Sequence, residues 1–600
     1  MRGPGDLNAL LRTAELHYVG GELADARPLV ERVLAAVGRQ PGVLNLYGLI
    51  LSGLGRLAEA RAALEAAHHA APGDPQVANN FGNVLGRLGE HEAALAAYEA
   101  AIAGAQDFAP ARLNQAITLD ALGRFKEARA ALASLERIAA PTPDALVASA
   151  SISRNSGHAR EAAGKLEAAL AIDPGHAPAR RARARVALEL GEPDAAERHR
   201  RLLAEGAGDR GVVLGYLAAA ETMAAREEAT GHVARALAAD PGWVEGHRAL
   251  AAARWEDGAP GHTRSFDAAL SERPHDPALW AGYVAALGAV DKHRAAADIA
   301  LRAEVATGDS AFAVAAFAYA SAAGELAAAE ATLARLPPAL VQPLALAKHR
   351  LRQRDPGAAE PLLAIATERA PDDVEAWALR GIAWQLLGDD RFHWLNGQPG
   401  LVSVETLALD ALEIEALAER LRALHANSRR RVGQSLRGGT QTADNLFDRE
   451  EPEVVLLARA IGDAVERHRC ALPRADAAHP LLRYRDCAWG FAGAWSIRLT
   501  GGGFHVQHVH PRGIVSAACY WAVPAPGMAD PQEGWLEIGG APAYLALDVE
   551  PLHRVQPQVG RLALFPSTLH HGTRPFAAGE RMSVAFDVAP CATGAAGVAG

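Results

Sequence analysis

A repeating unit of 34 residues is the feature that most constrains how this 600-residue chain can fold. Six glycines stand 34 residues apart, and an alanine follows each of them five residues later. The glycines are Gly21, Gly55, Gly89, Gly123, Gly157 and Gly191, and the alanines are Ala26, Ala60, Ala94, Ala128, Ala162 and Ala196. Two registers that run in parallel over so many residues indicate an array of repeated structural units.

Each repeat is expected to form a pair of helices. Segments such as 43–54 and 57–70 carry apolar residues at the i, i+3, i+4 and i+7 positions of an amphipathic helix. The recurring glycine falls where the first helix must end and the chain must turn, often with a positive φ. The recurring alanine lies early in the second helix, where a larger side chain would keep the two helices apart.

These residues, with Pro72 and Pro174 at repeat boundaries, resemble the tetratricopeptide repeat. We expect an all-α superhelical solenoid over residues 1–390, regular to about residue 205 and degenerate after it. Such a solenoid implies a concave surface for a protein or peptide partner. The alternative left open is that the array serves only as a scaffold or dimerisation arm.

Composition excludes several other roles. Half of the residues are apolar and the formal net charge is −10, so nothing favours nucleic acid or an anionic membrane as a partner. The first residues lack the apolar core of a signal peptide, and no apolar run is long enough to cross a bilayer. The four cysteines have no CxxC spacing, which is typical of free thiols in a reducing compartment. A cytoplasmic location is therefore expected.

The sequence changes character after residue 390. Residues 391–483 are expected to form a helical linker and support region, with amphipathic stretches at 407–424 and 454–468 and a polar loop at 434–442 that could cover a site. Residues 484–592 show short alternating or β-branched segments between Gly- and Pro-rich turns, which predict a small β-sandwich or barrel. Residues 593–600 are expected to be a flexible tail.

A histidine cluster lies within the predicted β region, in the stretch 503–511. If this stretch is a strand, His508 and His510 share one face and His505 lies on the other. Two imidazoles at i and i+2 can bind one metal ion, and His571 could be the remote third ligand. Arg581 and Ser583 follow His571 in the chain.

This layout resembles the 2-oxoglutarate/Fe(II) oxygenases of the double-stranded β-helix (jelly-roll) fold, in which an HxD or HxE pair precedes a distant His and an Arg-x-Ser. Residues 494–499, 508–511 and 565–567 are similar to a bacterial subgroup also found fused to tetratricopeptide repeats. The resemblance covers roughly 430–590 and implies a dioxygenase that uses Fe(II), 2-oxoglutarate and O2 to hydroxylate a substrate.

The resemblance also implies roles for single residues. His508 and His571 would bind Fe(II), and Arg581 would pair with the distal carboxylate of 2-oxoglutarate. Ser583 would donate a hydrogen bond to that carboxylate, and Tyr520 or Arg498 could assist.

One position departs from the family pattern, because His510 stands where the carboxylate ligand is usual. His510 as third ligand of a three-histidine site is favoured. The alternatives are a two-histidine site completed by water, or a carboxylate supplied by Asp530, Glu533 or Glu537.

Neighbouring histidines are assigned lesser roles. His505 is expected to lie behind the ligands or face the substrate, and His570 is the neighbour of His571 that could replace it. A cupin-like metal domain fits less well, because Ile514 and Val515 stand where a cupin glutamate is expected. The rival from another class is a catalytically inactive domain on a repeat scaffold that acts as a protein-interaction adaptor.

Overall fold

The computed structural model describes residues 4–206, 208–220, 222–425, 436–442, 445–449, 451–525 and 530–591. The chain divides into two compact units, Met1–Gly208 and Asp209–Gly600. The tail predicted at residues 593–600 lies outside the described residues.

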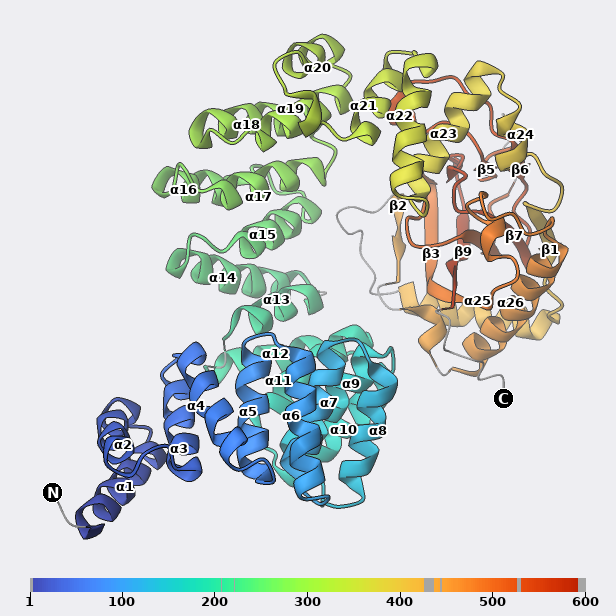
Figure 1. Ribbon diagram of the computed structural model, residues 1–600. Coiled ribbons are helices and arrows are strands. Elements are labelled where there is room, and N and C mark those ends of the chain that lie inside the picture. The colour runs from blue at the N-terminus through green and yellow to red at the C-terminus, as the bar shows by residue number, and fades with distance from the viewer. Residues whose placement is uncertain are drawn as a thin grey trace. The chain divides into compact units, whose positions relative to one another are not determined.

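The first unit consists of helices that pack in antiparallel pairs along the chain (Figure 1). Two of them, α3 and α4, correspond to the amphipathic helices predicted at 43–54 and 57–70. The helices are α1 (Pro4–Val19), α2 (Leu23–Val37), α3 (Pro41–Gly53), α4 (Leu57–Ala70), α5 (Pro75–Arg87), α6 (His91–Gly104), α7 (Ala109–Ala121), α8 (Phe125–Glu136), α9 (Pro143–Asn155), α10 (Ala159–Ile172), α11 (Ala177–Glu189) and α12 (Ala195–Ala204).

The two recurring residue types have the roles that the period predicts. All six recurring glycines adopt a positive φ, from 65° at Gly191 to 86° at Gly157, in the turn between the helices of a pair. The first five recurring alanines are completely buried where the two helices meet. In the last pair Ala195 is the buried residue instead of Ala196, so the register has shifted by one position at α12.

Helix pairs continue into the second unit, as the degenerate repeats predict. Their helices are α13 (Arg210–Ala219), α14 (Met223–Ala239), α15 (Val244–Glu256), α16 (Arg264–Glu272), α17 (Pro277–Gly288), α18 (His293–Thr307), α19 (Ala311–Ala322), α20 (Leu326–Leu333), η1 (Pro338–Leu340), α21 (Pro343–Arg352), α22 (Pro356–Arg369), α23 (Val374–Leu387) and α24 (Arg391–Asn396).

An antiparallel sheet region follows the helices. A six-stranded sheet has the order β1-β7-β4-β9-β3-β2, and a three-stranded sheet has the order β6-β5-β8. The elements are β1 (Ser403–Thr406), α25 (Ala411–His425), β2 (Leu436–Gln441), η2 (Leu446–Asp448), α26 (Pro452–Ala471), η3 (Leu482–Tyr484), β3 (Trp489–His505), β4 (Val515–Ala522), β5 (Leu536–Ile538), η4 (Ala543–Leu545), β6 (His553–Val555), β7 (Arg561–Pro566), β8 (His571–Thr573) and β9 (Glu580–Pro590).

Strand alternation gives the six-stranded sheet two different faces. On one face, Val584 and Phe586 of β9 join a hydrophobic core with Leu417 and Leu421 of α25 and with residues of α26. The opposite face presents the intervening residues of β9, and β7 packs there against β5 and β6 through Phe565. The two sheets therefore pack face to face, with helices covering the outer side of the larger sheet.

The stretch 391–483 contributes more than helices. Its strand β1 pairs with β7, and its strand β2 pairs with β3. The expected loop at 434–442 is therefore corrected: Leu436–Gln441 is an edge strand, while Gln434 and Ser435 lie outside the described residues. Two glycines in β2 lowered its apparent strand propensity, but the pairing with β3 supplies the backbone hydrogen bonds.

The sheet region is packed onto the last repeats. Leu545 of η4 is completely buried in a hydrophobic cluster with residues of α21, α22 and α23. Trp394 donates a hydrogen bond to Asp476, and His479 Nε2 lies 3.0 Å from the carbonyl oxygen of Leu395. These contacts hold the strands against the end of the helical array within the second unit.

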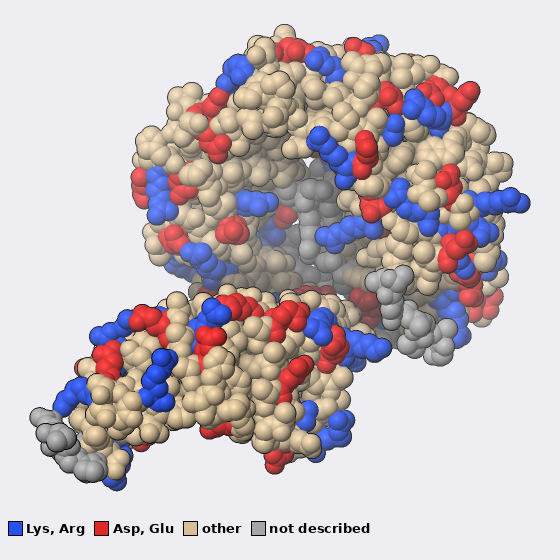
Figure 2. Space-filling view, viewed as in Figure 1, with Lys and Arg blue, Asp and Glu red and all other residues tan. Residues whose placement is uncertain are grey.

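The described surface seen in Figure 2 carries side chains of both charges and no extended basic patch, in keeping with the formal net charge of −10. Acidic and basic side chains are interspersed on the face seen in Figure 2. Among the described residues, no helix is both long and apolar enough to span a lipid bilayer.

Candidate metal centre

The histidine motif does not lie on a regular strand, which corrects the sequence prediction. Strand β3 ends at His505 and the chain then bends, so that His508 forms an isolated bridge with His571. The N–H of His508 donates to the carbonyl oxygen of His571 at 3.0 Å, and the reverse bond measures 2.9 Å. Because alternation fails at the bend, His505 faces the same cavity as the other histidines, and its ring stacks on His508 with 5.7 Å between centroids.

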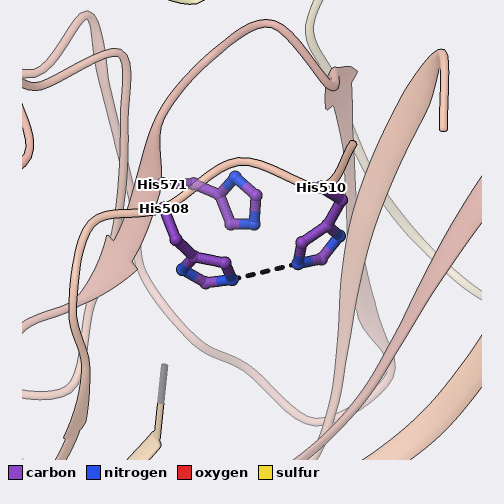
Figure 3. Close-up of side chains that lie close together, drawn as sticks. All are labelled: His508, His510 and His571. Atoms are coloured by element: carbon purple, nitrogen blue, oxygen red, sulfur yellow. Dashed lines mark hydrogen bonds between the residues drawn. The ribbon is translucent and has the colours of Figure 1, made fainter. Parts of the chain in front are cut away.

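The side chains of His508, His510 and His571 point toward a common centre (Figure 3). Their potential ligand nitrogens all lie within 4.8 Å of one another. The Nε2 atoms of His508 and His510 are 3.0 Å apart. Two imidazole nitrogens that bind one ion at about 2.1 Å each are separated by a comparable distance.

Each of the three imidazoles is held by an oxygen on its other nitrogen. The Nδ1 atom of His508 lies 2.8 Å from the Val506 carbonyl oxygen. The Nδ1 atom of His510 lies 2.6 Å from Oδ1 of Asp587, and that of His571 lies 3.1 Å from the Leu569 carbonyl oxygen. Carbonyl and carboxylate oxygens only accept, so each Nδ1 must carry the proton. In the neutral rings every Nε2 then presents a lone pair to the centre, and a proton or a cation is required between them.

Burial keeps the rings of His508 and His571 ready to bind a metal. Burial lowers the pKa of His508 to about 4, with the neighbouring His510 adding to the effect. The pKa of His571 is also lowered well below its ordinary value, chiefly by burial. A metal ion needs neutral imidazoles, so ligands that stay unprotonated bind it without first losing a proton.

The three histidines line a cavity of about 360 Å³ between the two sheets. This volume lies in the range of small-molecule sites. The other lining residues come from both sheets and from the bend: Gln441, Trp495, Ile497, His505, Val509, Ala517, Ala518, Leu536, Gly572, Thr573, Arg581, Ser583 and Ala585.

Arg581 is the cationic group in this lining. The residue is 2 % exposed, its Nε donates to the Gly534 carbonyl oxygen at 3.0 Å, and its guanidinium lies 4.9 Å from the centroid of the Tyr520 ring. Among the described residues, no carboxylate lies within ion-pair distance of it. A buried cation without an anionic partner is costly, which makes the cavity suited to an anionic ligand.

The remaining predicted residues are placed as follows. Ser583 lies on the cavity face of β9, two residues after Arg581, and Tyr520 lies beneath the guanidinium without lining the cavity. Arg498 lies outside the lining and pairs with Glu580 at 2.6 Å.

The acids considered as alternative ligands are engaged elsewhere. Asp530 and Glu537 both pair with Arg574, and Glu533 accepts from the N–H of Ala577. None of them lines the cavity. His570 is buried away from the lining, and burial lowers its pKa to about 3.

Two residues of the site were not anticipated in these roles. Trp495 lines the cavity and contacts His510 edge-on, with 5.3 Å between ring centroids. Asp587 receives the His510 hydrogen bond across 77 positions of sequence, and no local pattern marks it. Only the alternation of side chains along β9 could have suggested that Asp587 lies on the same face of the sheet as Arg581 and Ser583.

Together these features define a class: a helical repeat protein in which three converging histidines and a buried arginine line one cavity. Three imidazoles suit several divalent first-row metals, so the donor set alone does not select one.

Comparison with known families makes the assignment more specific. Residues 493–587 match the family described as "Putative 2OG-Fe(II) oxygenase", and residues 3–75, 79–143 and 344–390 match the tetratricopeptide repeat. The chain thus carries tetratricopeptide repeats and a domain of this oxygenase family, as predicted from the sequence. No match was found among curated proteins.

Solved structures similar to the chain include tetratricopeptide repeat proteins. One from Parabacteroides merdae is 15 % identical, covers 41 % of this chain and 97 % of its own, and has a TM-score of 0.35. A thermophilic one from Thermus thermophilus is 22 % identical, with 30 % and 99 % covered and a TM-score of 0.28. PilF of Pseudomonas aeruginosa is 19 % identical, with 34 % and 94 % covered and a TM-score of 0.30.

Proposed function

We propose that the protein is a 2-oxoglutarate- and Fe(II)-dependent dioxygenase that hydroxylates a protein or peptide side chain recruited by the helical repeats. The two sheets that pack face to face would form the double-stranded β-helix of these enzymes. The match of residues 493–587 to the oxygenase family supports Fe(II), 2-oxoglutarate and O2 as the reactants at this site.

One observation carries the proposal: three converging imidazole nitrogens share a cavity with a buried arginine that has no carboxylate partner among the described residues. A metal alone does not need the arginine, and an anion alone does not need the histidines. A co-substrate with an end that chelates metal and a distal carboxylate uses both.

In this proposal His508, His510 and His571 hold Fe(II). Bound iron would supply the coordination positions and redox chemistry for oxygen activation. Arg581 pairs with the distal carboxylate of 2-oxoglutarate, and Ser583 donates a hydrogen bond to it. The apolar lining, including Ile497 and Leu536, keeps bulk water from the reacting atoms.

The repeats support a macromolecular substrate. Tetratricopeptide repeats generally mediate protein–protein interactions, and the last repeats pack directly against the sheet region through Leu545. A segment held by these last repeats would therefore be kept near the cavity at a high effective concentration. A cytoplasmic location accords with the four free cysteines.

The test is an anaerobic titration of the purified protein with Fe(II) and 2-oxoglutarate, followed by the visible charge-transfer band of the chelate. His571→Ala and Arg581→Ala should each abolish the band. His553→Ala is the matched control, since His553 is exposed on β6 and does not line the cavity.

The outcomes separate the competing functions. A band that depends on both residues supports the dioxygenase. Metal binding without the band would favour an inactive or cupin-like metal domain, and no metal binding at all would leave an adaptor whose working part is the repeats.

A further inference from the structure

A buried carboxylate, Asp587, lies directly behind His510. Its side chain is 9 % exposed, and it accepts hydrogen bonds on Oδ1 from His510 Nδ1 at 2.6 Å and from the Ser516 hydroxyl at 2.9 Å. Ser516 and Asp587 are cross-strand neighbours in the β4–β9 pairing, so strand register fixes this contact.

The surrounding backbone is built closely around this carboxylate. A Cβ added to Gly513 would lie 3.0 Å from the Asp587 Cβ and 3.0 Å from the Ser567 hydroxyl oxygen. The turn that carries His510 into β4 therefore passes so close to Asp587 that a larger residue at position 513 would require neighbouring atoms to shift. The Ser567 hydroxyl lies 2.9 Å from that of Ser516 and extends the same network.

The carboxylate of Asp587 has no permanently charged cation beside it. Among the described residues, no Lys or Arg lies within ion-pair distance of it, and its partner His510 carries a positive charge only if protonated. A buried carboxylate costs free energy unless positive charge compensates it. Bound through Nε2, a divalent cation would provide that charge along the imidazole of His510.

We infer that Asp587 is the carboxylate of this metal centre, acting through His510 instead of binding the ion itself. The position that usually carries an acidic ligand holds His510, and the three-histidine set by itself brings no negative charge. The His510–Asp587 pair restores one negative charge and fixes the ring with Nε2 toward the ion. Asp587 is thus a positioning and charge-compensating residue, an inference that rests on the proposed metal site.

The inference predicts a specific pattern of metal affinities. Loss of an outer carboxylate behind a histidine ligand typically weakens metal binding by about 10- to 100-fold. Asp587→Asn keeps an oxygen that can accept from Nδ1 but removes the charge, so it should already weaken binding about 10-fold or more. Asp587→Ala, which removes both, should weaken it further.

The experiment measures Co(II) dissociation constants by chelator competition in the full-length apoprotein, without 2-oxoglutarate. The proteins are the wild type, the two Asp587 variants, His510→Ala, and the double variant His510→Ala/Asp587→Asn. Because Asp587 acts through His510, the Asn substitution should have little effect once His510 is absent. The visible Co(II) spectrum of Asp587→Asn should also shift, since the field of the His510 ligand changes.

Two controls separate this role from a purely structural one. Glu580→Gln neutralises another carboxylate of β9, paired with Arg498 and Arg422, and should leave Co(II) affinity within a few fold of wild type. Ser516→Ala removes one hydrogen bond to Asp587 but keeps its charge, and should have a smaller effect than Asp587→Asn. Circular dichroism and tryptophan fluorescence verify that each variant is folded.

The inference is overturned if Asp587→Asn binds Co(II) as tightly as the wild type, or if the effects of the two substitutions simply add. It also falls with the proposed function if the wild-type protein binds no metal. A wild type that binds metal but forms no complex with 2-oxoglutarate would remove the dioxygenase proposal and leave the role of Asp587 intact.

Discussion

Replacing Arg581 by methionine should separate a ligand-binding arginine from a structural one. In the protein without ligand, the buried guanidinium donates to the Gly534 carbonyl oxygen and contacts the Tyr520 ring. The substitution removes a charged hydrogen bond that contributes about 1.5–3 kcal/mol to stability and a cation–π contact that contributes up to about 2 kcal/mol. It also removes the cost of burying an uncompensated charge, which is several kcal/mol.

These opposing contributions nearly cancel, so the free energy of unfolding of Arg581→Met without ligand should lie within about 2 kcal/mol of the wild-type value. The two proteins should differ when 2-oxoglutarate is added with Mn(II) under anaerobic conditions. At 100 times its dissociation constant, a ligand stabilises the folded wild type by about 2.7 kcal/mol. The variant should show none of this stabilisation.

Tryptophan fluorescence is the appropriate assay. All ten tryptophans lie between residues 243 and 535, so the signal reports on the second unit alone. Arg498→Met is the matched control, because Arg498 already has Glu580 as its partner and lies outside the cavity lining. It should retain the ligand-induced shift.

Two results would refute this reasoning. If Arg581→Met lost more than about 3 kcal/mol without ligand, the guanidinium would be part of a satisfied internal network whose disruption is costly. If 2-oxoglutarate still stabilised the variant, the carboxylate would bind elsewhere.

Three further predictions concern stability and the packing at the site. Burial lowers the pKa of His425 and of His468 from 6.5 to about 4, so the unfolded chain binds more protons than the folded chain between these pH values. The free energy of unfolding should therefore fall as the pH drops from about 6.5 to 4, by at most about 3 kcal/mol per histidine. His468→Gln should flatten this pH dependence, as measured by urea unfolding followed by tryptophan fluorescence. Gly157 has a φ of 86°, so Gly157→Ala should destabilise the first unit by about 1–2 kcal/mol. Gly164 lies within α10 with open space around it, so Gly164→Ala should stabilise that unit by about 0.5–1 kcal/mol. Thermal unfolding followed by circular dichroism at 222 nm measures both changes, and equal effects would contradict the turn geometry. Gly572→Ala would place a Cβ 2.9 Å from the His505 carbonyl oxygen. We therefore expect this substitution to displace the bend that carries His508 and to weaken Co(II) binding at least 10-fold. Unchanged Co(II) affinity would show that the bend can move without harm to the site.

The sequence by itself determined the helical repeats, because their information is local. Gly55 and Ala60 belong to one helix pair, and the same spacing repeats six times, so a turn that needs a positive φ and a close helix contact both appear as a period. The candidate ligands His508, His510 and His571 could also be selected in advance, because their order along the chain, with Arg581 after them, forms a motif.

What only the tertiary structure decided depends on residues far apart in the chain. The bend after His505, which brings that residue into the cavity, is set by the backbone bridge between His508 and His571, and strand alternation alone predicted the opposite face. The edge strand β2 exists because β3 supplies its hydrogen bonds. Asp587 reaches His510 only through the register of β4 against β9, since pairing between distant strands is fixed by packing that no local pattern records.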